Sequence, residues 1–143
     1  MVTEFQIRFI LKENMNEILP LVQMLNNYKI PFETLKKRLQ DMLMDGYQCL
    51  GAYDKEELIG ICGVWVLNKL YIGRHLEPDN VFVLPEYRSS GVGKLMLDQV
   101  LNYALEIGCN TTEINCYINN EKGIQFWNNQ GYKAIGYHMQ KVL

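Results

Sequence analysis

The sequence predicts a single-domain mixed α/β fold, and three observations lead to this prediction. The chain has 143 residues, a length that suits one domain and leaves little room for two. Apolar residues make up 48% of the chain and charged residues 21%, so the chain can bury a core and lacks the composition of a disordered protein. Segments with the period of a strand also alternate with segments that have the period of a helix.

The N-terminal half predicts a strand, two helices and a hairpin, in that order. Residues 4–10 alternate between apolar and polar types, as a half-buried strand does. Residues 13–28 and 31–46 place apolar side chains on one helical face, and the second of these helices begins at a proline and ends at a glycine. The stretches 47–53 and 58–67 are rich in apolar residues and are joined by a polar turn, which predicts an antiparallel hairpin.

The C-terminal half predicts alternating strands and helices. An extended stretch ends at residues 81–84, just before a proline. Residues 91–107 form the strongest amphipathic helical pattern in the chain. A strand over 111–118, a helix over 120–130 and a final strand over 132–142 complete the predicted order.

Charge and hydropathy argue against several classes of protein. The formal net charge is −2, whereas a nucleic-acid binder usually has a basic face. No apolar run approaches the roughly 20 residues that a membrane-spanning helix needs. The first residues lack the basic segment that opens a secretory signal. We therefore expect a cytoplasmic protein with neither a nucleic-acid partner nor a membrane partner.

The cysteines and histidines show no metal-binding spacing. These residues are Cys49, Cys62, Cys109, Cys116, His75 and His138. No two cysteines form a C-x-x-C pair, and the two histidines are far apart in the sequence. We expect reduced thiols, which suit a cytoplasmic protein, and no metal site.

The most informative stretch is the loop from Val83 to Lys94, where a strand leads through glycines into a helix. Free backbone N–H groups and the positive end of the helix dipole make such a turn suitable for an anion. A Walker A loop is excluded because Arg88 stands at its first glycine position and Leu95 at its hydroxyl position. A dinucleotide fingerprint is excluded because Met96 stands at its third glycine position.

Two motifs in the C-terminal half resemble those of the GNAT superfamily of N-acetyltransferases. The first, Arg88-x-x-Gly91-x-Gly93, follows a strand and resembles the pyrophosphate loop of that family, R/Q-x-x-G-x-G/A. The second runs from Asn120 to Tyr132 and is similar to the family stretch N-x-x-A-x-x-x-Y-x-x-x-G-F. The order of predicted elements also fits, so the resemblance covers essentially the whole chain.

The resemblance implies one domain over residues 1–143, with a mixed central sheet that is splayed between its fourth and fifth strands and flanked by about four helices. It also implies acetyl-CoA as co-substrate, lying where these two strands part, and no metal. The backbone of Val81, Phe82 and Val83 would pair with the pantetheine arm. The pyrophosphate would lie on the backbone of Ser89, Ser90, Gly91, Val92, Gly93 and Lys94.

Three further side chains have both an implied role and a simpler one. Arg88 would brace the phosphate loop, or it would be a solvated side chain. Asn120 would reach the pantetheine arm while also capping the helix that it begins. Trp127 stands where relatives commonly carry Tyr; it would pack against the cofactor near its sulfur, or it would be buried for packing alone.

The transfer needs a base, because a primary amine is protonated at neutral pH. Strand alternation predicts that Glu77, Asp79, Val81 and Val83 lie on one face. Asp79 matches a position where relatives often carry an acidic residue, so Asp79 or Glu77 is the candidate base. In the simpler interpretation, both are solvated carboxylates before a strand.

The proton donor departs from the family pattern. The indole N–H of Trp127 cannot act as an acid at neutral pH, so a tyrosine donor at that position is absent. Tyr117 is the preferred candidate, because it lies on the predicted strand 111–118 beside the cofactor cleft. Tyr132, Cys116 and water could also supply the proton.

The sequence therefore favours an acetyl-CoA-dependent N-acetyltransferase that moves an acetyl group to a primary amine by direct transfer in a ternary complex. Residues 68–80 are expected to line the acceptor pocket, and their mixed charge favours a small polar molecule; His75 is expected to be a solvated loop residue. The alternative is an acyl-CoA-binding sensor or interaction module with a vestigial site. Two residues favour it: Trp127 replaces the usual Tyr, and Asn115 stands at a position that is acidic in some relatives. The sequence is compatible with a monomer and with a homodimer.

Overall fold

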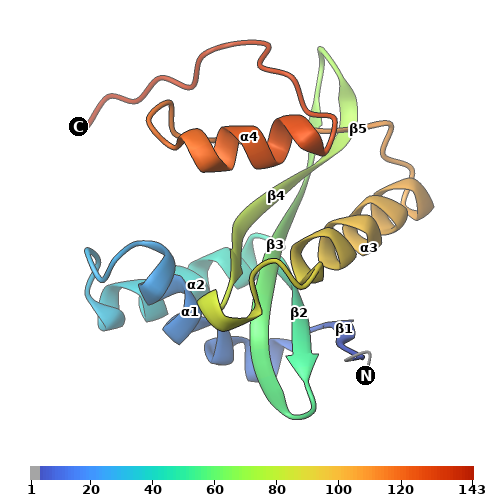
Figure 1. The fold of residues 1–143 in the computed structure, drawn as a ribbon. Coiled ribbons are helices and arrows are strands. Elements are labelled where there is room, and N and C mark those ends of the chain that lie inside the picture. The colour runs from blue at the N-terminus through green and yellow to red at the C-terminus, as the bar shows by residue number, and fades with distance from the viewer. Residues whose placement is uncertain (1–3) are drawn as a thin grey trace.

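A five-stranded mixed sheet organises the computed structural model, which describes residues 4–143 (Figure 1). The strands are β1 (Gln6–Phe9), β2 (Gln48–Asp54), β3 (Glu57–Lys69), β4 (Gly73–Val83) and β5 (Thr111–Thr112). They lie side by side in chain order. Every neighbouring pair is antiparallel except β4 and β5, which are parallel. A parallel pair needs a crossover connection, and the helix between β4 and β5 supplies it.

Helices pack on both faces of the sheet and confirm the predicted α/β class. They are the 3₁₀ helices η1 (Lys12–Ile18) and η2 (Pro85–Tyr87) and the α-helices α1 (Leu19–Leu25), α2 (Phe32–Met44), α3 (Val92–Glu106) and α4 (Glu121–Asn129). The single helix expected over 13–28 is instead η1 followed by α1. Pro20 lies in the first turn of α1, where its missing N–H is not needed, and the chain before it winds more tightly.

The core has two halves, one on each face of the sheet. The residues that pack with α1 and α2 include Tyr47, Cys49 and Phe82. Those that pack with α3 include Leu76 and Val100. All of them are at most 9% exposed, so each half excludes water almost completely.

A β-bulge in β4 corrects the prediction that Glu77, Asp79, Val81 and Val83 share one face. Asp79 pairs with Gly63 and Phe82 with Ile61, so two residues of β4 lie opposite the single residue Cys62. Asn80 takes up the extra length with a φ of 56°, a left-handed conformation that Asn tolerates better than most residues. The bulge reverses the alternation: Val81 and Val83 pack on the α3 side and Phe82 on the α1 and α2 side.

The C-terminal segment is more open than the sequence predicts. Of the predicted strand 111–118, only Thr111 and Thr112 pair, because β4 runs beside them for two residues and then diverges. No part of 132–142 is in a strand, although its side chains follow a strand pattern. Tyr137 is 92% exposed, so this segment has no neighbouring strand to cover it among the residues that the structure describes.

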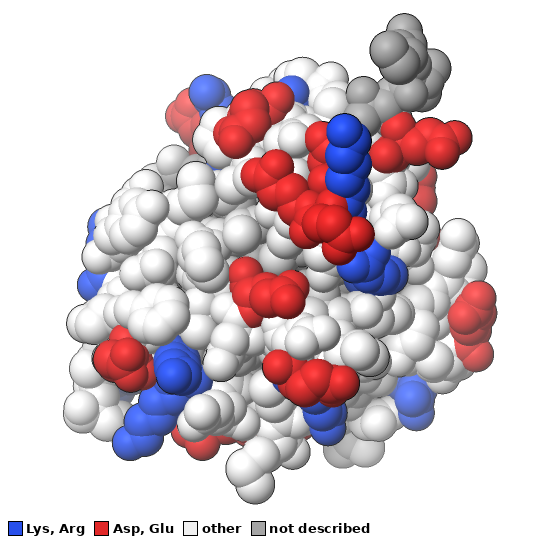
Figure 2. Space-filling view, turned by 90° about the horizontal axis from the view of Figure 1, so that it is seen from below, with Lys and Arg blue, Asp and Glu red and all other residues white. Residues whose placement is uncertain are grey.

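The surface and the thiols match what the composition suggests. On the face shown in Figure 2, basic side chains lie scattered among acidic ones rather than gathered in one patch. All four cysteines are free thiols; Cys49, Cys62 and Cys109 are buried and Cys116 is half-buried. Within residues 4–143, none of the helices combines the length and the apolar character needed to cross a membrane.

Candidate acetyl-transfer site

The sheet opens between β4 and β5, beyond two paired residues. His75 pairs with Thr111 and Leu76 with Thr112, and the N–H of Glu113 then donates to the Leu76 carbonyl at 3.0 Å. From that point the chain after β5 leaves β4 (Figure 1). The rest of β4, as far as Val83, therefore has an edge that no described strand pairs with. Such an edge offers free N–H and C=O groups to an extended partner.

The register shows which backbone groups of β4 face this open edge. The N–H of Leu84 donates to the carbonyl of Ile59 on β3 at 2.9 Å. Since backbone direction alternates along a strand, Phe82 also faces β3, whereas Val81 and Val83 face the open edge. Of the three residues expected to pair with a cofactor, Val81 and Val83 thus direct their backbone groups to the open edge and Phe82 does not. The Val83 carbonyl already accepts one hydrogen bond, from the Arg88 side chain.

Arg88 holds the loop that follows β4. Its Nε–H donates to the carbonyl of Val83 at 2.9 Å, and its guanidinium carbon lies 5.1 Å from the centre of the Phe82 ring. Tyr87, just before it, donates from its hydroxyl to Oδ2 of Asp54 at 2.7 Å. This hydrogen bond to a carboxylate raises the pKa of Tyr87 to about 12, so the hydroxyl stays protonated and the bond persists at neutral pH.

The N-terminus of α3 is uncapped and open. Gly91 precedes the helix with a φ of 88°, and no side chain caps the first turn. Nothing lies within 4 Å of a Cβ placed on Gly91, so the space in front of the helix is open. The Gly91 carbonyl accepts from the N–H of Leu95 at 3.0 Å, whereas the first N–H groups of a helix have no partner within it. These groups add to the positive end of the helix dipole.

The predicted loop residues lie at this turn. Ser89 has a φ of 67°, and the hydroxyl of Ser90 donates to the carbonyl of Tyr87, so both serines shape the turn. Lys94 pairs with Asp98 one helical turn later, at 2.8 Å. A Cβ on Gly93 would lie 3.9 Å from the ring of Phe126, which places α4 against the start of α3.

Asn120 and Trp127 belong to α4. The Asn120 side-chain oxygen accepts from the N–H of Gly123 at 3.0 Å, so the predicted N-cap is present. Trp127 is half-buried between two aromatic rings, with its centre 5.0 Å from that of Phe126 and 5.2 Å from that of Tyr132. The Tyr132 hydroxyl in turn accepts from Thr112 on β5 at 2.7 Å. The helix is therefore fixed to both α3 and β5.

Asp79 faces a cavity on the side of the sheet that α1 and α2 cover. The indole N–H of Trp65 donates to its Oδ2 at 3.0 Å. The cavity has a volume of about 180 Å³ and is lined by Ile18, Leu19, Val22, Leu35, Arg38, Leu39, Met42, Asp79 and Asn80. Asp79 thus lies where α1, α2 and the bulge of β4 meet, a lining with few polar groups and one cation.

Sequence reasoning missed the group of residues beneath Asp79. Tyr47 is 1% exposed, and its hydroxyl accepts from the amide of Asn80 at 3.3 Å. Burial raises the pKa of Tyr47 far above its usual value and that of Cys49 to about 12, so both stay neutral under Asp79. The only sequence signal for this group is the aromatic residue at the start of a predicted strand, which is also typical of an ordinary core position.

Glu77 lies away from that cavity, in a group with His75 and Glu113. His75 is fully buried in β4, which corrects the expectation of a solvated loop residue. Its Nε2 lies 3.4 Å from a carboxylate oxygen of Glu77 and 3.6 Å from one of Glu113. The structure therefore separates the two candidate bases: Asp79 lines the cavity and Glu77 faces a histidine.

Tyr117 is not on a strand. It lies in the turn before α4, and 84% of its side chain is exposed. Cys116, next to it, is half-buried, and partial burial raises the pKa of its thiol. A catalytic role for Tyr117 stays a prediction, one that requires the exposed segment to lie over the cofactor when it is bound.

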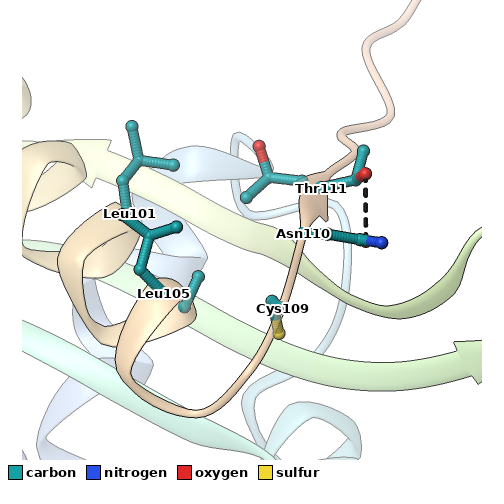
Figure 3. Close-up of a pocket in the computed structure, with 7 residues that line it drawn as sticks. Leu101, Leu105, Cys109, Asn110 and Thr111 are labelled. Atoms are coloured by element: carbon teal, nitrogen blue, oxygen red, sulfur yellow. Dashed lines mark hydrogen bonds between the residues drawn. The ribbon is translucent and has the colours of Figure 1, made fainter.

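A second cavity, of about 230 Å³, lies between the end of α3 and β5 (Figure 3). It is lined by Leu101, Ala104, Leu105, Cys109, Asn110, Thr111 and Thr112. None of these side chains is a carboxylate or a cation, so this cavity offers no group for moving a proton from an amine.

Comparisons with known proteins identify the family of the chain. The profile of the acetyltransferase (GNAT) family matches residues 15–132. A protein of Bacillus subtilis described as an uncharacterized N-acetyltransferase is 22% identical over 132 residues, which are 91% of this chain and 92% of that protein. Thialysine N-ε-acetyltransferase of Sus scrofa is 25% identical over 85 residues, but this match spans only 50% of the pig protein and 57% of this chain.

A solved structure shows the same fold. The aminoglycoside N-acetyltransferase AAC(6′)-Iy in complex with CoA superposes with a TM-score of 0.83 at 17% identity, covering 98% of this chain and 95% of that one. The family profile spans well over half of the chain, including β2 to β5, α3 and α4. The chain belongs to the acetyltransferase (GNAT) family.

Proposed function

We propose that this protein transfers an acetyl group from acetyl-CoA to a primary amine of a small polar molecule, directly and in a ternary complex. The observation that carries the proposal is the continuity of two features. The open edge of β4 at Val81 and Val83 leads through the Arg88 loop to the uncapped N-terminus of α3. An extended arm that ends in a pyrophosphate needs these two features in this order.

Each part of the cofactor has a matching group in the chain. The pantetheine arm pairs with the backbone of Val81 and Val83 as an added strand would. The pyrophosphate lies on the N–H groups between Ser89 and Lys94, with Arg88 holding the loop from behind. Asn120 and Trp127 lie on the far side of the cleft, on α4, where the indole packs beside the arm.

The protonated amine must lose two protons, and the departing CoA thiolate must gain one. Asp79 is the better base, because it lines the cavity in which an amine fits and is held by the Trp65 indole. Asp79 takes one proton from the protonated amine, and the neutral nitrogen attacks the thioester carbonyl. The C–S bond then breaks, the nitrogen releases its second proton to water, and the CoA thiolate takes a proton from Tyr117 or from water. Holding the two reactants side by side supplies much of the rate enhancement, and the acid and base add to it.

The acceptor class rests on similar proteins and on the cavity. One relative is named for the ε-amine of thialysine and one structural neighbour for aminoglycosides, and both are small polar molecules with primary amines. The cavity of about 180 Å³ beside Asp79 suits an acceptor of modest size. The acidic side chain of Asp79 also attracts a protonated amine before it is deprotonated.

The test combines binding with turnover on the full chain. Acetyl-CoA should raise the melting temperature in a concentration-dependent way, as a ligand selective for the folded state must. A panel of primary amines that includes thialysine and an aminoglycoside should then reveal release of free CoA. Asp79→Asn should lower kcat at least tenfold with cofactor binding unchanged, whereas Asp45→Asn at the exposed end of α2 should match the parent.

Two results would count against this enzyme. A melting temperature that millimolar acetyl-CoA leaves unmoved would refute the cofactor site. Tight acetyl-CoA binding without turnover of any amine in the panel would instead favour an acyl-CoA-binding sensor, whose aromatic cluster around Trp127 would serve only to hold the cofactor.

A further inference from the structure

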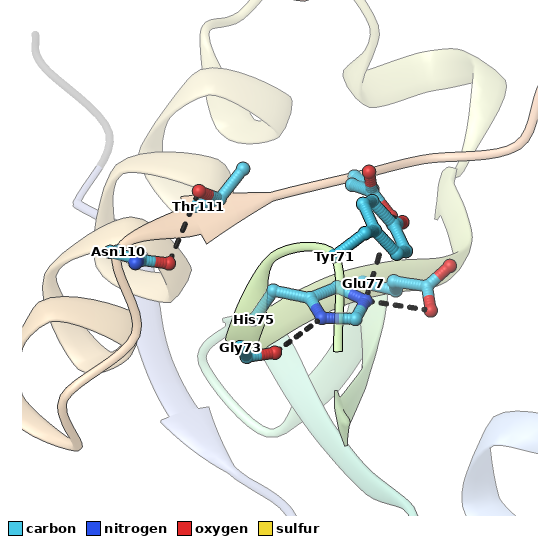
Figure 4. A network of polar contacts seen from close by, with 7 residues as sticks. Tyr71, Gly73, His75, Glu77, Asn110 and Thr111 are labelled. Atoms are coloured by element: carbon cyan, nitrogen blue, oxygen red, sulfur yellow. Dashed lines mark hydrogen bonds and ion pairs between the residues drawn. The ribbon is translucent and has the colours of Figure 1, made fainter. Parts of the chain in front are cut away.

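We propose that His75, Glu77 and Glu113 form a binding site for one Zn²⁺ ion at the point where β4 and β5 begin to part. Each residue offers one ligand atom, and these three atoms lie within 4.8 Å of one another. Two of the residues come from β4, and the third directly follows β5. Figure 4 shows the imidazole of His75 directed at the neighbouring carboxylate of Glu77. The proposal goes beyond acetyl transfer and does not depend on it.

The histidine supplies the strongest reason. His75 has no exposed surface, and its Nδ1 lies 3.2 Å from the carbonyl of Gly73. A carbonyl only accepts hydrogen bonds, so Nδ1 carries a proton. In a neutral imidazole the lone pair is then on Nε2. Within residues 4–143, Nε2 of His75 is the one buried side-chain polar atom that has no hydrogen-bond partner. Nε2 lies next to two carboxylates, and a positive charge between these three groups would pair with all of them.

The spacing favours a metal ion over a proton as that charge. A charge-assisted N–H to carboxylate hydrogen bond is about 2.7–2.9 Å long. The distances from Nε2 to Glu77 and Glu113 are longer, at 3.4 and 3.6 Å. Two ligands that each lie about 2.1 Å from a tetrahedral zinc ion are about 3.4 Å apart. The two distances from Nε2 therefore match the edges of a zinc coordination shell, and the two carboxylate oxygens lie within 4.8 Å of each other.

The surroundings hold the ligands as a metal site requires. The hydroxyl of Tyr71 donates to Glu113, and the Gly73 carbonyl orients His75 through the other ring nitrogen, which is the usual support for a metal-binding imidazole. Both carboxylates are 18% exposed, which leaves a path from solvent.

The ligand set selects the ion and suggests what it does. One imidazole nitrogen with two carboxylates suits zinc better than magnesium or calcium, which prefer oxygen ligands alone. Three protein ligands leave the fourth position open to water. Because β4 and β5 pair at only two residues, an ion held by both would fasten the strands just before they part.

The test measures zinc binding by the full chain after treatment with EDTA. Competition with a chromophoric chelator should give one Zn²⁺ per chain, and the zinc-loaded protein should melt at a higher temperature. Glu113→Gln keeps the shape of the side chain but removes its charge. Loss of a supporting group around a metal costs about 10–100-fold in affinity, so loss of this ligand should cost at least tenfold. Tyr71→Phe should weaken binding without abolishing it.

Two controls make the result decisive. His138→Gln removes the only other histidine of the chain and should leave the zinc affinity unchanged. Glu106→Gln, at the end of α3, should also leave it unchanged. The proposal is overturned if zinc fails to bind at micromolar concentration, if Glu113→Gln binds as tightly as the parent, or if His138→Gln loses the ion. A circular dichroism spectrum that matches the parent would show that Glu113→Gln is folded, which excludes unfolding as the cause of weaker zinc binding.

Discussion

At the scale of single residues, Gly91 tests the proposed pyrophosphate site at the start of α3. It combines a left-handed φ of 88° with open space in front of the helix. We predict that Gly91→Glu abolishes binding of acetyl-CoA, because the new side chain fills that space and its charge repels the pyrophosphate. Isothermal titration calorimetry with the purified variant measures the loss.

A matched control comes from the other end of the same helix. Gly108 has a φ of 86° and is equally open, so Gly108→Glu carries the same backbone strain and the same charge. It should bind acetyl-CoA with the affinity of the parent. Equal loss in both variants would mean that strain in α3, and not the position of the charge, weakens binding.

A substitution of Tyr117 tests whether this residue is the proton donor. Its hydroxyl is exposed in the structure, so Tyr117→Phe should leave the free energy of unfolding nearly unchanged. If its hydroxyl protonates the departing thiolate, kcat should fall at least tenfold while the affinity for acetyl-CoA is kept, since a general acid contributes about 10²–10⁴-fold. Tyr137→Phe, in an equally exposed tyrosine, is the matched control. An unchanged kcat in Tyr117→Phe would leave water as the donor.

At the scale of elements, the sequence predicts a helix boundary best where a single residue determines the local structure. Asn120 begins a helix because its side chain caps it, and Pro20 lies in a first turn because it lacks an N–H. The bulge at Asn80 is different. It appears only when β4 is laid against β3, so alternation alone assigned Val81 and Val83 to the wrong face.

The strands after α3 show the same limit. Residues 113–118 and 132–142 have apolar residues in a strand pattern, but a strand also needs a neighbour to pair with. Beyond Thr112 the chain after β5 has parted from β4, and the last segment pairs with none of residues 4–143. The group of His75, Glu77 and Glu113 is also not predictable from the sequence pattern, because Glu113 follows β5 and is far along the chain from the other two residues.

The cap of α4 gives an element-scale prediction. Asn120→Ala removes the acceptor for the Gly123 N–H, so the free energy of unfolding should fall by about 1 kcal/mol. Asn120→Asp keeps an acceptor at the helix N-terminus and should stay within a few tenths of a kcal/mol of the parent. Urea denaturation measures both. If Asn120→Ala lowers affinity for acetyl-CoA while Asn120→Asp does not, the cap also positions α4 over the cofactor.

At the scale of the whole molecule, both halves of the core bury ionisable groups. The half under α1 and α2 includes Tyr47 and Cys49, which lie directly beneath Asp79. Burial raises the pKa of both, and it also raises that of Cys62 on the other side of the same sheet. The protein therefore keeps its centre neutral, while the catalytic chemistry that we propose takes place at the rim.

The buried thiols predict how the stability of the protein depends on alkaline pH. The Cys49 thiol has a usual pKa of 9.0, which the folded state raises to about 12. Between these values the unfolded chain loses the proton and the folded chain keeps it. The stabilisation is therefore complete below pH 9 and is lost as the pH rises towards 12, by about 1.4 kcal/mol per pH unit for one such group.

Urea denaturation at pH 8 and pH 10.5 should show this fall in the free energy of unfolding. Cys49→Ala should be less stable at pH 8 but lose less stability on going to pH 10.5. Val100→Ala, an equally buried truncation without an ionisable group, should lose as much with pH as the parent. A parent protein with the same stability at both pH values would show that these thiols reach water in the folded state.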